Sequence, residues 1–343
     1  MRQCLFGLAA CAAAAAASAS PLKDCQGIKA DPVRLACYDR LAKEAEPAAT
    51  VVILDKDQKD PPKLPVVIER APPPSPVSAL SELWELDPES KAGTFRFRTH
   101  NPTYILPVYA TSDVNERPFS PADGHTLAED RKQQPGEVKF QLSFKTKLME
   151  DLFDGRSDLW FGYTQQSWWQ LYNRDVSAAF RETNYAPELI LSTRVNYDLF
   201  GWKARMLNLG FLHQSNGRDL PLSRSWNRVY AQAGLEKGDW VLLLRPWYRV
   251  PEKKNDDDNP DINRYMGYGD VVAAWKHAGH TVSLTGRYNA NSGKGAAQVD
   301  WSFPISRQLK GYMQLFTGYG DSLIDYNHKQ TTLGIGVSLS EGL

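Results

Sequence analysis

The chain of 343 residues has no excess of charge of either sign, with 40 basic and 40 acidic side chains. A nucleic-acid-binding protein needs a clear basic excess to release counterions, so we expect no nucleic-acid partner. The mean hydropathy is also low, at -0.46. This value argues against a helical membrane protein, which needs apolar runs of about 20 residues. Two classes remain: a large soluble β protein, and a β-barrel whose strands face lipid only at every second residue.

The start of the chain predicts a secretory signal peptide at 1–19. Arg2 gives a short positive start, an apolar stretch follows at 5–17, and an A-x-A cleavage site ends at Ala19. This pattern is typical of an exported protein. The alternative is a lipoprotein processing site at Cys11, although the apolar core before that residue would be short.

Cysteine is scarce in the rest of the chain, which divides into three parts. Residues 20–46 contain Cys25 and Cys37 among good helix formers, and they predict a small helical segment. Export would let a disulfide persist, but the sequence does not decide whether the two cysteines pair. Residues 47–78 are rich in proline, lysine and aspartate, which predicts a linker or a mobile tail. Residues 79–343 form the main domain.

Apolar and polar side chains alternate through most of residues 79–343, as they do in half-buried strands. The alternation is clear at 138–145, 189–198 and 333–340. The connections differ in length, with tight turns predicted at 200–201, 237–238 and 278–279, and long loops at 172–187, 216–222, 251–261 and 321–330.

Short turns on one rim and long loops on the other are typical of an outer-membrane barrel. The sequence therefore predicts an all-β protein, a twelve-stranded antiparallel transmembrane β-barrel with a short helical or disordered N-terminal extension. A soluble or periplasmic β protein is the alternative.

The alternation places three polar residues on the lipid side of two neighbouring strands. One outward row ends in His213 and Ser215, and the next contains Asn227. Polar groups that face lipid are costly unless they are paired or functional. Residues at i and i+2 lie about 6.5–7 Å apart, so His213 can reach the Ser215 hydroxyl while Asn227 meets the other ring nitrogen. Ser215, His213 and Asn227 would then be a nucleophile, a base and an orienting group, placed to attack lipid esters. The simpler alternative is that the three are only polar residues at the membrane interface.

Several motifs then resemble one known family. They are YTQQSWWQ at 163–170, FRETNY at 180–185, HQSNGR at 213–218, SRSWNR at 223–228 and SLIDYN at 322–327. Over residues 79–343 the chain resembles the outer-membrane phospholipase A of Gram-negative bacteria.

The resemblance implies calcium-dependent hydrolysis of the acyl esters of phospholipids and lysophospholipids by a homodimer in the outer membrane, near the outer leaflet. It implies that Ca²⁺ is bound by the carbonyl of Arg218, the hydroxyl of Ser223 and Ser177 of a second subunit. The N–H of Gly217 would share the oxyanion with calcium-bound water, and Gln165 would lie at the dimer interface.

One alternative function and one feature of the metal site stay open beside this interpretation. A barrel without catalysis, such as a porin or an adhesin, would share the fold. Leu220 stands where the family often has an acidic residue, which leaves the presence of a second calcium site undecided.

Overall fold

The computed structural model describes residues 34–35, 78–306 and 309–340. Arg34 and Leu35 belong to a separate unit, residues 1–71, and both are helical. Apart from Arg34, Leu35 and Ser78, the predicted signal peptide, Cys segment and linker lie outside the described residues, and so do Cys25 and Cys37.

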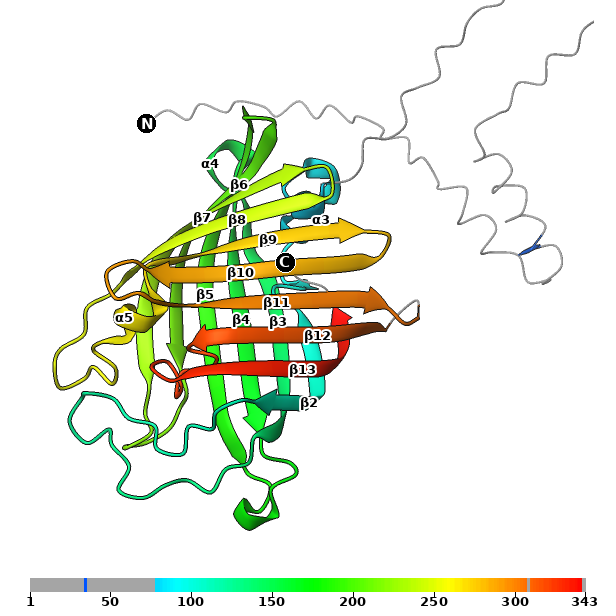
Figure 1. The fold of residues 1–343 in the computed structure, drawn as a ribbon. Coiled ribbons are helices and arrows are strands. Elements are labelled where there is room, and N and C mark those ends of the chain that lie inside the picture. The colour runs from blue at the N-terminus through cyan, green and yellow to red at the C-terminus, as the bar shows by residue number, and fades with distance from the viewer. Residues whose placement is uncertain (1–33, 36–77, 307–308, 341–343) are drawn as a thin grey trace, which may run out of the picture. The chain divides into compact units, whose positions relative to one another are not determined.

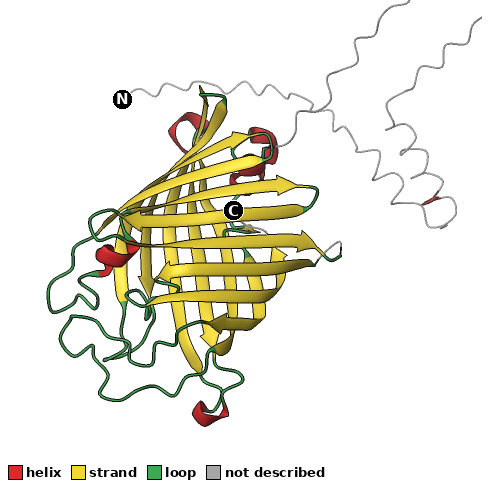
Figure 2. Cartoon of the chain, viewed as in Figure 1, coloured by secondary structure: helices red, strands yellow, loops and turns green. Residues whose placement is uncertain are grey.

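Twelve antiparallel strands, β2 to β13, close into a barrel (Figures 1 and 2). Each strand pairs with its neighbours along the chain, and β2 pairs with β13, so the described sheet has no open edge. The strands are β2 (Thr103–Thr111), β3 (Gly136–Asp151), β4 (Ser157–Trp169), β5 (Phe180–Leu199), β6 (Trp202–Ser215), β7 (Ser225–Lys237), β8 (Trp240–Arg249), β9 (Gly269–His277), β10 (His280–Asn289), β11 (Lys294–Pro304), β12 (Lys310–Tyr319) and β13 (Lys329–Ser340). The predicted fold is confirmed. A two-residue strand, β1 (Phe97–Arg98), also pairs with β3.

The two rims of the barrel differ as predicted. Tight turns join β5 to β6 and β9 to β10, whereas long loops join β6 to β7, β8 to β9 and β12 to β13. The prediction of a loop over 172–187 is wrong in extent, because β5 already begins at Phe180 and contains Pro187. A strand tolerates proline where the ladder needs no N–H, and in the β5–β6 ladder residues 186 and 187 have no paired residue between Tyr185↔Ser215 and Glu188↔Leu212.

Five short helices lie in the connections and at the start of the described barrel unit: α3 (Ala79–Trp84), η1 (Pro88–Ser90), α4 (Leu152–Gly155), η2 (Arg174–Val176) and α5 (Ile262–Met266). None of the helices in the described part of the chain is long and apolar enough to cross a membrane.

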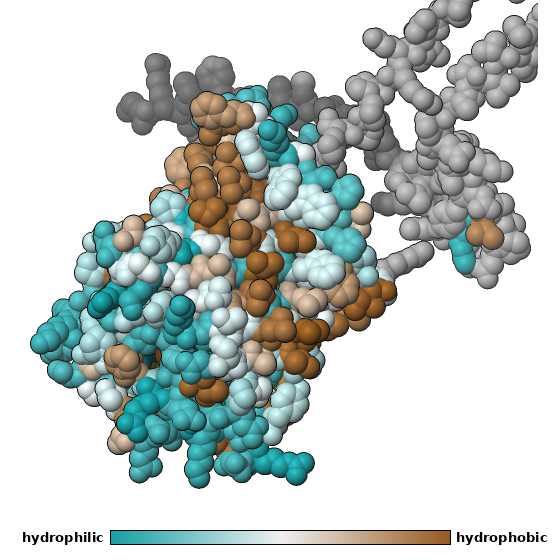
Figure 3. Space-filling model, in the orientation of Figure 1, coloured by the Kyte–Doolittle hydropathy of each residue, from teal (hydrophilic) through white to brown (hydrophobic). Residues whose placement is uncertain are grey.

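The barrel carries apolar side chains on its outer face. Leu209 is 56% exposed and Phe211 45%, whereas Leu212 and Trp226, which point inward, are 7% and 0% exposed. Figure 3 shows apolar side chains over the strands and a hydrophilic end where the long loops gather. This distribution suits a barrel wall that faces lipid.

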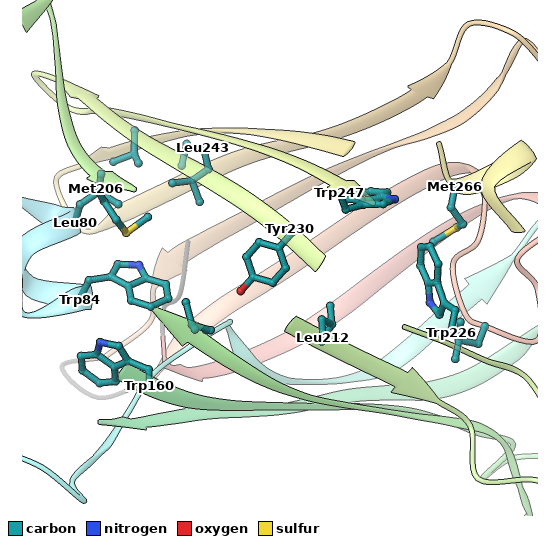
Figure 4. Close-up of a cluster of buried hydrophobic side chains, with 14 of the residues drawn as sticks. Leu80, Trp84, Trp160, Met206, Leu212, Trp226, Tyr230, Leu243, Trp247 and Met266 are labelled. Carbon is teal, nitrogen blue, oxygen red and sulfur yellow. The ribbon is translucent and has the colours of Figure 1, made fainter. Parts of the chain in front are cut away.

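The interior is filled by side chains near α3. Leu80 and Trp84 of this helix pack with Trp160 and Met206 (Figure 4), and the Trp84 and Trp160 rings meet edge to face at 6.1 Å. Glu236 of β7 accepts hydrogen bonds from the start of the helix, including Leu80 N at 2.7 Å. The first residues of the predicted barrel domain therefore form a helix that packs against the inward-facing side chains of the strands.

Candidate active site

Strands β6 and β7 bring His213 and Asn227 together. The register pairs these two residues directly, and side chains at such opposite positions have β-carbons about 5 Å apart. His213 Nδ1 lies 2.8 Å from Asn227 Oδ1. The hydrogen bond therefore follows from the strand pairing.

Alternation along both strands places the predicted catalytic residues on the outer face. Their chain neighbours Leu212 and Trp226 are buried on the inside, and the preceding outward residue on β6 is the exposed Phe211. The three residues, all half-buried, are His213, Ser215 and Asn227.

Ser215 is the last residue of β6 and shares a face with His213. Among the residues that the structure describes, no hydrogen bond joins the Ser215 hydroxyl to the His213 ring. Residues at i and i+2 are about 6.5–7 Å apart, a separation that two side chains can span. Hydrogen bonds between catalytic groups are often long in the free enzyme and tighten when substrate binds.

Glu252 fixes the orientation of the Asn227 amide. Asn227 Nδ2 donates to Glu252 Oε1 at 2.8 Å, so Asn227 Oδ1 faces the His213 ring. Because a carbonyl oxygen only accepts, the ring nitrogen Nδ1 must be the donor and must carry the hydrogen. Nε2 is then the basic nitrogen, as a general base requires.

The loop that follows β8 supplies Glu252. Val250 N donates to Asn227 O at 2.9 Å, which holds the end of β8 beside Asn227. The Glu252 side chain is 15% exposed. Burial raises the pKa of Glu252 above its ordinary value, while the hydrogen bond from Asn227 and the positive charge of Arg249 oppose this effect. Sequence reasoning missed Glu252, because strand alternation carries no signal for contacts made by a loop.

Asn216 closes the loop 216–224, which begins directly after Ser215. Asn216 Nδ2 donates to Leu222 O at 2.8 Å, and Asn216 Oδ1 accepts from Arg224 N at 3.0 Å. The two ends of the loop are thereby held together.

Gly217 lies in this loop with a φ of 60°, a left-handed conformation that glycine adopts without steric cost. A β-carbon at this position would lie 3.3 Å from Cε2 of the Tyr185 ring. Gly217 thus lets the backbone turn tightly two residues after Ser215, where its N–H is a candidate donor to an oxyanion.

Arg218 ties the same loop to the start of β5. Its Nη2 donates to the carbonyls of Phe180 and Arg181 at 3.0 and 2.7 Å, and its Nε lies 3.4 Å from a Glu182 carboxylate oxygen. The side chain is therefore used for anchoring, and the backbone carbonyl is the oxygen that Arg218 can offer to a ligand.

Asp258 binds the hydroxyls at the other end of the loop. Ser223 Oγ and Ser225 Oγ donate to Asp258 Oδ2 at 2.8 and 3.1 Å, and His125 Nε2 lies 3.0 Å from Asp258 Oδ1. Sequence reasoning did not single out Asp258, although it lies in the predicted long loop 251–261. The structure thus gathers hydroxyl and carboxylate oxygens beside the predicted ligand Ser223.

This donor set fits a calcium ion. Ca²⁺ prefers carbonyl, hydroxyl and carboxylate oxygens and retains waters, and such oxygens are present at Arg218 and Ser223. The described residues contain no group of three or more His, Cys, Asp or Glu side chains that could hold a metal. Ser177, the third predicted ligand, is exposed in the β4–β5 connection, and no hydrogen bond joins it to Arg218 or Ser223 among the described residues. Its exposure suits a residue offered to a second copy.

Gln165 lies in a row of polar groups on β4. It accepts from Tyr163 Oη at 3.1 Å, and its Nε2 donates to Ser167 Oγ at 3.3 Å. Its neighbours in the ladder are Leu142 and Tyr185. The amide is half-buried on the outward-facing row, with its hydrogen bonds made inside one chain.

Comparison with known proteins identifies relatives over most of the chain. The model of the phospholipase A1 family matches residues 80–339. A putative phospholipase A1 from Neisseria meningitidis serogroup B is 41% identical over 344 aligned residues, which cover 92% of this chain and 90% of the relative.

Two solved structures share the fold. An outer membrane phospholipase dimer with bound calcium from Salmonella typhi has a TM-score of 0.66 and 39% identity, covering 73% of this chain and 94% of its own. An active-site mutant of Escherichia coli outer membrane phospholipase A, in which alanine replaces an asparagine, has a TM-score of 0.69 and 37% identity, covering 77% and 99%.

Proposed function

Because this chain belongs to the phospholipase A1 family, we propose that it hydrolyses acyl esters with Ser215 as nucleophile, His213 as general base and Asn227 as the residue that orients the ring. Phospholipid hydrolysis and a β-barrel of the outer membrane follow from the family itself. The assignment of the three residues rests above all on the 2.8 Å contact between His213 Nδ1 and Asn227 Oδ1. The related structure with an active-site asparagine replaced supports the same role for an amide.

The chemistry follows from the tautomer of His213. With hydrogen on Nδ1, Nε2 takes the proton of Ser215 Oγ as this oxygen attacks the acyl carbonyl. The resulting imidazolium keeps its Nδ1–H bond to Asn227 and then gives its Nε2 proton to the departing glycerol oxygen. Water, activated by the same nitrogen, attacks the acyl-enzyme, releasing the fatty acid and restoring Ser215. The N–H of Gly217 donates to the oxyanion of each tetrahedral intermediate.

The outer-face position of these residues determines which substrates reach them. They lie beside exposed apolar side chains such as Phe211, so the ester bonds of lipids in the surrounding leaflet can approach without leaving the membrane. We place this site near the outer leaflet, since the long loops adjoin it and the signal peptide predicts export. Phospholipids and lysophospholipids are the substrate class.

Calcium is the proposed cofactor. The oxygens that would hold it are the carbonyl of Arg218 and the hydroxyl of Ser223, together with Ser177 contributed by a second copy of the chain. When bound there, the cation supplies positive charge beside the oxyanion. The calcium in the related Salmonella dimer supports this assignment.

Dimerisation is the proposed activator, because the calcium site would be incomplete in one chain. Gln165 is the proposed polar contact across the interface. Its hydrogen bonds to Tyr163 and Ser167 would be supplemented by the same amide of the second copy. The monomer should then show little hydrolysis.

One experiment tests the proposed function directly. Purified, detergent-folded protein is assayed for phospholipid hydrolysis with calcium and with excess EDTA, beside Ser215→Ala. The wild type should need calcium, and Ser215→Ala should lose at least ~10³-fold in rate. Full activity of the alanine variant would overturn the triad, whereas full activity in EDTA would overturn only the calcium site. A porin-like or adhesin-like barrel without catalysis would show no hydrolysis in either protein.

A further inference from the structure

The Asn227 amide is neutral, and a neutral amide stabilises an imidazolium less well than a carboxylate does. On the side opposite His213, this amide meets the carboxylate of Glu252, at 2.8 Å from Asn227 Nδ2. His213, Asn227 and Glu252 therefore form one hydrogen-bonded chain that runs from β6 through β7 to the loop after β8, and Ser215 lies beside it on the face of β6 that carries His213. We propose that Glu252 is a positioning residue of the active site, which locks the Asn227 amide and adds the negative charge that the triad lacks. This inference rests on the proposed function.

The first effect of Glu252 is geometric. A free asparagine amide can present either its oxygen or its nitrogen to the ring, and the wrong choice would place a donor against the Nδ1–H of His213. An ionised carboxylate only accepts, so it selects the orientation in which Nδ2 faces Glu252 and Oδ1 faces the ring. The tautomer with Nε2 as the base is thereby fixed.

The second effect is electrostatic. The other carboxylate oxygen, Glu252 Oε2, is buried and has no hydrogen-bond partner among the described residues. It lies 3.8 Å from Arg249 Nη2, which is itself engaged with Asp257 at 2.5 Å. The negative charge is therefore only partly compensated, and because this oxygen is buried, water screens the charge little as it polarises the Asn227 amide toward the ring.

The local fold holds Glu252 in place for this role. Val250 N donates to Asn227 O, so the loop leaves β8 beside the amide, and Pro251 restricts the next backbone step. The charged groups that face Glu252 are Arg249 on β8 and, more weakly, Asp257 and Asp258 on its own loop. The imidazole of His213 on β6 is the titratable group reached through Asn227.

Three variants separate these effects. Glu252→Gln keeps an oxygen that can accept from Asn227 Nδ2 but removes the charge. Glu252→Ala removes both. Asp256→Asn is the matched control, because it removes an exposed negative charge from the same loop. The hydrogen bond of Asp256 to Lys253 O is made by its backbone N–H and is kept in this variant.

Each full-length variant is measured for kcat, KM and the pH dependence of kcat/KM with calcium in mixed micelles. Glu252→Ala should lower kcat by about 10- to 100-fold with KM changed less than about twofold. Glu252→Gln should recover part of that loss. In Glu252→Gln the acid limb of the pH profile of kcat/KM should move to lower pH by about half a unit or more. The reason is that protonated His213 loses the stabilising negative charge of Glu252. Asp256→Asn should match the wild type.

A wild-type kcat and acid limb in both Glu252 variants would overturn the proposal. So would a loss that appears only as lower thermal stability with an unmoved acid limb, because Glu252 would then merely hold the loop. Ser215→Ala in the same series separates this failure from that of the proposed function: an active Ser215→Ala overturns the triad, whereas an inactive one beside normal Glu252 variants overturns only the role of Glu252.

Discussion

Replacing Asn227 by alanine removes the contact on which the triad rests. The lost bond joins Asn227 Oδ1 to His213 Nδ1 over 2.8 Å. In the transition state the ring is positively charged, and a hydrogen bond to a charged group contributes about 1.5–3 kcal/mol. At about 1.4 kcal/mol per tenfold change in rate, kcat should fall by about 10- to 150-fold. This loss is smaller than that expected for Ser215→Ala, because the nucleophile and the base both remain.

The assay is fatty-acid release from phospholipid in mixed micelles at saturating calcium, with kcat and KM measured separately. KM should stay within about twofold, because the amide does not bind the lipid. Asn291→Ala is the control, since Asn291 is an exposed asparagine in the connection between β10 and β11. An Asn227→Ala enzyme with the kcat of the wild type would show that Asn227 does not orient His213, and so would a loss that appears only in KM.

Three further predictions concern the cofactor, the assembly and the stability of the barrel. Ser223→Ala should raise the calcium concentration needed for half-maximal hydrolysis by about tenfold while leaving the rate at saturating calcium largely unchanged; an unaltered calcium titration would remove Ser223 from the ligands. Gln165→Ala should weaken the calcium-dependent dimer by about tenfold, as measured by sedimentation in detergent, and an unchanged dimer would exclude the interface role. Burial raises the pKa of Asp325, but the ion pair with Arg181 and two hydrogen bonds outweigh burial, so the pKa lies below its ordinary value. The stability that this carboxylate contributes should therefore be present above about pH 4 and lost as the pH falls through the lowered pKa; Asp325→Asn should cost about 3 kcal/mol in urea unfolding at neutral pH, and a neutral effect would contradict the ion pair.

The barrel and the outer-face residues could be predicted from the sequence because both depend on a period of two. Once Leu209 and Phe211 are assigned to lipid, the same parity assigns His213 and Ser215 to the same face. The loop between β6 and β7 is long and does not fix their register, but the two strands follow one another in the chain, and the matching parity of Asn227 places it on the same face as its partner His213.

What the sequence did not predict lies where no period operates. Glu252 and Asp258 reach the site through the fold of the loop after β8, which depends on particular contacts such as that between Ser225 N and Asn259 Oδ1 at 3.0 Å. Helix α3 was missed because its six residues are too few to show a helical period. Pro187 led to a predicted loop where β5 continues, since a proline removes one N–H but does not end a strand whose other side stays paired, here with Tyr163.

The most direct test of the central claim is covalent labelling of the nucleophile. The calcium-loaded enzyme is treated with a fluorophosphonate probe bearing an alkyl chain, digested, and analysed by mass spectrometry. We expect one modified residue, Ser215, with labelling that needs calcium and is strongly reduced in His213→Ala. A label on another serine, or equal labelling of Ser215 in the absence of His213, would contradict it.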